Sequence, residues 1–104
     1  MIRIPRRTVL AALAAVPALP MAARAASHEI RIEDRAFVPP SVDAAPGDTI
    51  TFVNADAVAH TATADDASFD TGRIRPGESA TITVAGATGF VCRFHPKMKG
   101  AVNG

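Results

Sequence analysis

Alternation of apolar and polar residues with a period of two is the feature that most limits what this chain can fold into. It runs through residues 28–33, 49–53 and 79–84, where isoleucine, phenylalanine, valine or alanine occupies every second position. A period of two places alternate side chains on opposite faces of an extended strand, and β-branched residues favour that conformation. No stretch beyond residue 25 keeps a helical period for ten residues. The chain is therefore predicted to be all-β.

The turns between these segments also have recognisable sequence signals. Residues 45–48 and 75–78 read Ala-Pro-Gly-Asp and Arg-Pro-Gly-Glu, and Pro39-Pro40 marks a further break. Proline followed by glycine is the pair that the two central positions of a type II turn prefer. About seven short strands with turns at this spacing are typical of a small sandwich of two sheets.

Residues 1–25 have the features of an export signal. They carry four arginines and no acidic residue, with an apolar run at 8–19 and an Ala-Arg-Ala sequence that ends at Ala25. A basic start, a short apolar run and a small-x-small site define a secretory signal peptide, and this run is too short to span a bilayer. The adjacent Arg6-Arg7 resembles a twin-arginine signal, with the general secretory route as the alternative. We expect a signal peptide over 1–25, a mature domain over 26–104, and location in the periplasm without a membrane anchor.

The charge of the predicted mature domain excludes one class of partner. It holds seven basic and ten acidic residues, and several of the basic ones lie near the C-terminus. Nucleic-acid-binding domains instead carry a clear excess of clustered positive charge. We expect no nucleic-acid partner.

Cys92 is the single cysteine of this domain, so it cannot form an internal disulfide. A thiol that stays reduced in an oxidising compartment needs a reason, and the candidates are burial, catalysis or a metal. Strand parity places Cys92 on the inward face that Phe90 also occupies. His95 and Met98 follow at intervals of three residues. Thiolate, imidazole and thioether together suit copper in both oxidation states, and His60 is available as a second imidazole.

Motifs over most of the chain resemble the cupredoxin family, and most closely its amicyanin and plastocyanin-like members. The resemblance extends from about Ile30 to Val102, and its motifs are Phe37-Val38-Pro39, residues 46–54, His60, residues 76–79 and Cys92-x-x-His95-Pro96-x-Met98-x-Gly100. The two-residue spacers on either side of the loop histidine resemble those of amicyanin.

The resemblance implies a fold and a metal site. The fold is a small cupredoxin-like Greek-key β-sandwich. One type 1 copper per chain is held by His60, Cys92 and His95 in the equatorial plane and by Met98 in the axial position. Thr61 stands where the family often has an asparagine or serine that hydrogen-bonds the cysteine sulfur, so its hydroxyl is a candidate donor. His95 is expected in the turn that precedes a short last strand.

The function implied is single-electron transfer by Cu(I)/Cu(II) cycling, without enzymatic activity. The imidazole edge of His95 is the expected electron port, with Phe94, Pro96 and residues 55–59 as an apolar rim. Arg93, Lys97 and Lys99 are expected around that rim, where they favour brief docking of redox donors and acceptors with acidic surfaces. The protein is expected to be a monomer.

The residues alone leave other chemistries open. Copper storage or delivery uses the same donor types and is the main alternative. A zinc site of His60, Cys92 and His95 would leave the thioether unused, and a cysteine hydrolase would need a substrate pocket and an oxyanion hole. If cleavage follows Ala25, the new terminus Ala26-Ser27-His28 offers nitrogen donors for a second, square-planar copper or nickel site.

Overall fold

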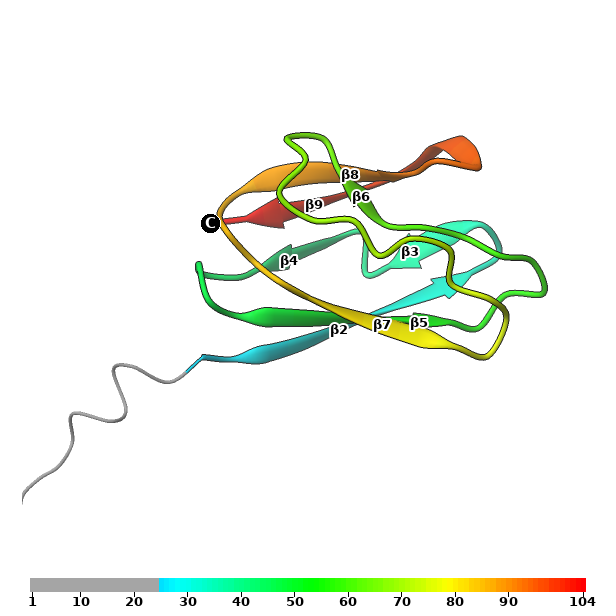
Figure 1. Cartoon of the computed structure of the whole chain (residues 1–104), viewed down its shortest axis with the longest axis horizontal. Helices are drawn as coiled ribbons and strands as arrows, with labels where there is room; N and C mark the ends of the chain where they lie inside the picture. Colours follow the sequence, from blue (N-terminus) through cyan, green and yellow to red (C-terminus); the bar gives the residue numbers. More distant parts are fainter. Residues whose placement is uncertain (1–24) are drawn as a thin grey trace, which may run out of the picture.

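Two four-stranded sheets pack face to face as a β-sandwich (Figure 1). The computed structural model describes residues 25–104, so the predicted signal peptide lies almost entirely outside the described residues. The described strands are β2 (Ser27–Glu33), β3 (Ala36–Val38), β4 (Ser41–Asp43), β5 (Thr49–Asn54), β6 (Thr63–Ala64), β7 (Ser79–Thr83), β8 (Thr88–Cys92) and β9 (His95–Asn103). The all-β sandwich is confirmed, with eight described strands where about seven were expected.

The strand order shows how the chain crosses between the layers. One sheet has the order β3-β2-β5-β7 and the other β4-β9-β8-β6. The β2–β5 and β4–β9 pairs are parallel, whereas the remaining pairs are antiparallel. Parallel neighbours cannot be joined by a tight hairpin, so the chain must leave one sheet and return through the other. The connection between β5 and β6 is one such crossing.

The predicted alternation fills the space between the sheets. Ile30, Ile32, Ile50 and Phe52 are all completely buried, and so is Asn54 on the same face at the end of β5. The residues between them on β2 and β5 are more exposed. Four phenylalanines interlock at the centre, with ring centroids 4.8–6.2 Å apart and mostly steeply inclined or edge-on planes. Edge-to-face contacts of this kind add stability beyond the area that they bury.

Both predicted type II turns are present. Gly47 and Gly77 have φ values of 95° and 83°, a conformation open to glycine at little steric cost. The amides of Asp48 and Glu78 donate to the carbonyls three residues earlier, at 3.0 and 2.9 Å. The prolines and glycines therefore set these two connections.

The last strand differs from expectation. β9 was predicted to be short, yet it has nine residues and is the longest described strand. It pairs with β8 on one side and with β4 on the other, so two neighbours hold a sequence that contains Pro96 and Gly100 in an extended conformation.

Three connections meet at one end of the sandwich. The β2–β3 turn, the start of the β5–β6 connection and the β8–β9 turn all lie at the right of Figure 1, opposite the C-terminus. The described part of the chain contains no helix long and apolar enough to cross a membrane.

Candidate metal centre

Cys92 ends β8 with its side chain in the core. The residue is completely buried, as is nearly all of Phe90 two positions earlier, so the inward orientation predicted from strand parity is confirmed. A bulge between Val91 and Cys92 interrupts the pairing with β9 at this point. Bulges re-aim side chains at strand ends, and this one places the thiol at the end of the sandwich where the connections meet.

His95 opens β9 directly opposite Cys92, which corrects the expectation that it lies in the turn. Arg93 and Phe94 alone form the turn, so the hairpin closes immediately and pairs Cys92 with His95. The imidazole is half-buried, and its Nδ1 lies 3.7 Å from the Cys92 Sγ. Strand pairing therefore fixes the spacing of two donors from a single hairpin.

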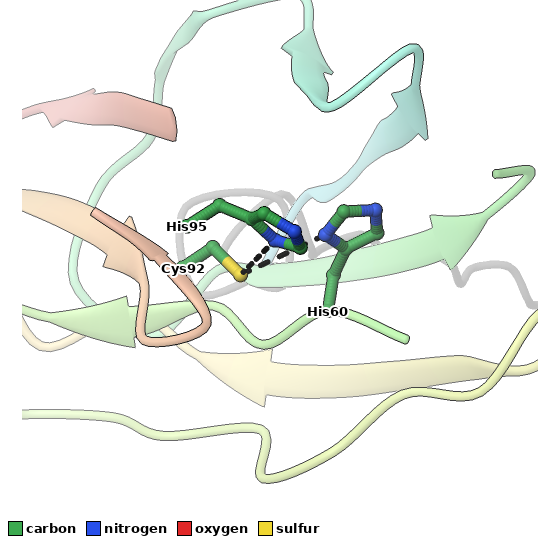
Figure 2. Close-up of side chains that lie close together, drawn as sticks. All are labelled: His60, Cys92 and His95. Carbon is green, nitrogen blue, oxygen red and sulfur yellow. Dashed lines mark hydrogen bonds between the residues drawn. The ribbon is translucent and has the colours of Figure 1, made fainter. Parts of the chain in front are cut away.

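His60 approaches from the other side of the sandwich. It lies in the crossing between β5 and β6, where its amide and carbonyl form a two-way bridge to Ile74 with N···O distances of 3.1 and 2.7 Å. The side chain is completely buried, and its Nδ1 also lies 3.7 Å from the Cys92 Sγ. Figure 2 shows both imidazoles converging on the sulfur, with the second nitrogen of His60 directed away from it.

This arrangement fits a metal ion. The donor atoms of His60, Cys92 and His95 all lie within 4.8 Å of one another. At the lengths typical of zinc–thiolate and zinc–imidazole bonds, about 2.3 and 2.0 Å, a metal with a trigonal angle near 120° would hold sulfur and nitrogen about 3.7 Å apart. Both observed sulfur–nitrogen distances equal that value. The soft and intermediate donors match copper, which accepts thiolate and imidazole together.

Met98 is the fourth predicted ligand. It lies on β9, three residues after His95, and is 4% exposed. Its side chain helps to line the same surface depression as His95. Its burial beside His95 is compatible with a thioether ligand, and the ligand role of Met98 stays a prediction.

Thr61 contacts the sulfur through its backbone rather than its side chain. Its amide donates to the Cys92 Sγ at 3.4 Å, whereas its hydroxyl accepts a hydrogen bond from the Arg93 amide at 2.9 Å. The hydroxyl expected to reach the sulfur therefore ties the β8–β9 turn to the crossing instead. A donor aimed at the sulfur is one of the contacts that tune a copper–thiolate bond.

Sequence reasoning missed two polar residues that hold His60. Asn54 is completely buried, and its side-chain amide donates to the carbonyls of Val58 and Ile74, both at 2.9 Å. The Asp56 Oδ2 lies 2.8 Å from the His60 Nε2. The available signal was an aspartate four residues before the histidine, although such a pair is common on solvated loops.

The Asp56 carboxylate is strongly stabilised in its charged form. Its contact with the His60 imidazole, followed by hydrogen bonds from the backbone amides of Ala57 and Arg35, lowers the pKa of Asp56 to about 2. At neutral pH the group is thus a carboxylate, which can only accept hydrogen bonds.

The surface beside His95 is a depression with apolar and basic walls. Its lining residues are Arg35, Phe94, His95, Pro96, Lys97 and Met98. Phe94 is 46% exposed, and the guanidinium of Arg73 lies 5.6 Å from its ring centre. Arg93 points elsewhere and forms an ion pair with Asp70. Phe94 and Pro96 of the predicted apolar rim and Lys97 of the predicted basic surround therefore line the depression, whereas residues 55–59 and Lys99 do not.

The second copper site considered at residues 26–28 stays a prediction, because its terminal amine would exist only after cleavage, whereas Ala26 here is joined to Ala25. The His28 Nε2 lies 3.0 Å from the Asp48 Oδ2, and the Ala26 amide donates to the other oxygen of the same carboxylate at 3.0 Å. Ser27 and His28 also pair with β5 as part of β2. A square-planar site would have to break these contacts, because the strand separates donors that such a site needs in one plane.

Comparisons with known proteins agree with the fold. A family model described as a cupredoxin-like domain matches residues 6–102. No match was found among curated proteins.

Two solved structures illustrate the structural likeness. A purple cupredoxin from Nitrosopumilus maritimus is 22% identical with a TM-score of 0.66, covering 73% of this chain and 97% of that one. Amicyanin from Paracoccus versutus is 23% identical with a TM-score of 0.60, covering 78% of this chain and 81% of that one. At these identities the likeness shows the fold, and the site must be argued from its own residues.

Proposed function

Because the chain belongs to the cupredoxin-like domain family, we propose that it is a type 1 copper protein that carries single electrons between redox partners. One copper per chain would be held by His60, Cys92, His95 and Met98. The observation that carries this proposal is the pair of 3.7 Å distances that join one buried sulfur to two imidazole nitrogens.

The ligands are held in a way that suits electron transfer. Copper bound there would supply a one-electron couple. Cys92 and His95 are fixed by strand pairing, and His60 by its backbone bridge to Ile74. Ligands that are anchored in this way move little when the charge of the site changes, which keeps the energy of reorganisation low. Electron transfer is then not slowed by rearrangement of the ligands.

The half-buried His95 gives the site its route to the surface. Its ring lines the depression beside Phe94 and Pro96, whereas His60 and Cys92 are completely buried. We propose that redox partners dock here briefly, as small apolar contacts rimmed by charge allow. Arg35, Arg73 and Lys97 make this rim basic, so partners with acidic surfaces are expected.

We further propose that residues 1–25 direct export to the periplasm and that residues 26–104 form the copper-binding domain. The support is the arginine-rich start, the short apolar run and the Ala-Arg-Ala sequence. In an exported protein, a single thiol must be shielded from oxidation. Complete burial of Cys92 provides that shielding.

Repeated redox cycling in the presence of a Cu(I) chelator tests electron carriage directly. The protein loaded with Cu(II) is reduced and reoxidised several times while its visible absorption and copper content are followed. We expect full return of colour and retention of copper, because burial and rigid ligands oppose release. Loss of copper on reduction would contradict electron carriage and favour the alternative, copper storage or delivery.

A further inference from the structure

Both nitrogens of the His60 imidazole have defined partners. Nδ1 faces the Cys92 sulfur at 3.7 Å, and Nε2 lies 2.8 Å from the Asp56 Oδ2. Because the partner of Nε2 is a carboxylate, which only accepts, Nε2 must carry the ring proton. In the neutral ring, this leaves the lone pair on Nδ1, the atom that faces the sulfur and would bind a metal. Asp56 thus selects the tautomer that the proposed site requires.

The Asp56 carboxylate is itself held from several directions. Its Oδ2 also accepts the Arg35 amide at 2.9 Å, and its Oδ1 accepts the Ala57 amide at 2.8 Å. The amide of Asp56 donates to the Oδ1 of buried Asn54 at 2.8 Å. The side chain is 16% exposed. A carboxylate with this many donors has one preferred position and can transmit it to the imidazole.

The Arg35 contact comes from a turn in an unfavourable conformation. Asp34 and Arg35 join β2 to β3 with φ values of 50° and 56°. Two successive positive φ values define the two-residue hairpin turn that glycine or asparagine usually occupies. Non-glycine residues adopt this region at a cost and keep it where surrounding contacts compensate for that cost. One such contact is the hydrogen bond that the Arg35 amide donates to the Asp56 carboxylate.

We propose that Asp56 is a positioning residue for the metal centre, which orients His60, fixes its tautomer and makes its imidazole a stronger donor. The inference rests on the proposed function, since it takes His60 as a ligand. A stronger donor stabilises Cu(II) more than Cu(I), so the carboxylate lowers the reduction potential. Outer carboxylates of this kind act on the ligands of many metal sites.

The chain contains a matched control for this role. The β4–β5 turn lies at the opposite end of the sandwich (Figure 1). Asp48 in this turn has the same kinds of contact: a histidine Nε2, from His28, and the backbone amides of Ala26 and Ala45, each at 3.0 Å. His28 faces no thiol, so this pair shares the local chemistry of Asp56 and His60 without the metal site. A purely structural role predicts similar consequences when either aspartate is changed.

The experiment compares Asp56→Ala, Asp56→Asn and Asp48→Asn in the full chain. The first readout is the nitrogen-15 NMR spectrum of the His60 ring in the metal-free protein, and the second is Cu(II) affinity together with reduction potential. We expect the Nε2–H tautomer in the wild type and a mixture in Asp56→Ala. Cu(II) affinity should fall about 10- to 100-fold in that variant, the usual effect of removing such a partner. The potential should rise.

The remaining variants separate positioning from folding. Asp56→Asn keeps an acceptor in the same place, so it should restore the tautomer while leaving the potential raised through loss of charge. Asp48→Asn should leave the His60 spectrum, the affinity and the potential unchanged. A wild-type tautomer and affinity in Asp56→Ala, or equal effects from Asp48→Asn, would overturn the proposal. Failure of the wild type to form a type 1 site would contradict the proposed function instead, and the tautomer measurement would still test the role of Asp56.

Discussion

At the scale of single residues, Gly100 shows how closely the core is packed beside the site. A Cβ at this position would overlap the Phe90 ring and lie 3.0 Å from the Pro40 carbonyl oxygen. Phe90 cannot yield easily, because it packs against three other phenylalanines.

Gly100→Ala is therefore predicted to destabilise the fold by about 1–3 kcal/mol, the usual cost of overpacking a core. Urea unfolding followed by circular dichroism measures this. Gly86→Ala is the matched control, since nothing lies within 4 Å of a Cβ there and its stability should stay close to that of the wild type. Equal stability of the two variants would show that the Phe90 ring is not confined as described.

The identity of single residues also explains what the sequence could predict about the site. Cys92, His95 and Met98 were identifiable because few residues of their types exist beyond residue 25 and their spacing is regular. Asp56 was not, since a carboxylate four residues before a histidine gains meaning only when the loop closes. The contact of Thr61 with sulfur was placed on the wrong atom, because a backbone amide leaves no trace in the sequence.

At the scale of secondary-structure elements, Asp48 fastens the beginning of β2 to the β4–β5 turn. Its carboxylate accepts hydrogen bonds from both segments. The Ala26 amide, the His28 imidazole and the Ala45 amide lower the pKa of Asp48 to about 2. A carboxyl whose pKa is lower in the folded than in the unfolded state stabilises the fold while it is ionised.

This contribution should be complete above about pH 4, the ordinary carboxyl value, and should disappear as pH falls toward 2. Asp48→Asn is therefore predicted to lower the free energy of unfolding at neutral pH and to reduce its decline between pH 4 and pH 2. Denaturant unfolding at a series of pH values checks both effects. An unchanged acid profile in Asp48→Asn would mean that the carboxylate does not fasten β2.

Elements with regular alternation were predictable, and those whose conformation depends on neighbours were not. β2, β5 and β7 match the predicted segments to within a residue, because each buries one face. β9 contains a proline, two lysines and a glycine, so its sequence alone favours a loop. Pairing with β8 and β4 overrides that preference, and it also moves His95 from a turn to the start of a strand.

At the scale of the whole molecule, the proposed centre joins the two sheets. Cys92 and His95 belong to the sheet that contains β8 and β9, while His60 follows β5 of the other sheet. A metal bound at this end would connect segments that are more than thirty residues apart in sequence. Metal binding to the folded state alone would add stability, which is valuable in a domain too small to bury a large core.

The architecture was predictable at this scale because patterning, turn chemistry and ligand spacing all agree with one fold. The contacts among the β2–β3, β5–β6 and β8–β9 connections were not predictable. They include those from Arg35 to Asp56 and from Arg93 to Thr61, which form only when the sheets have packed.

The most direct test of the central claim is the spectrum of the metal-free protein, with its thiol reduced, after addition of one equivalent of Cu(II). We predict an intense thiolate-to-copper absorption in the visible range that bleaches on reduction and returns on oxidation, and its absence in Cys92→Ser. A wild-type protein that stays colourless, or that gives only the electron paramagnetic resonance spectrum of ordinary square-planar Cu(II), would contradict a copper site of His60, Cys92, His95 and Met98.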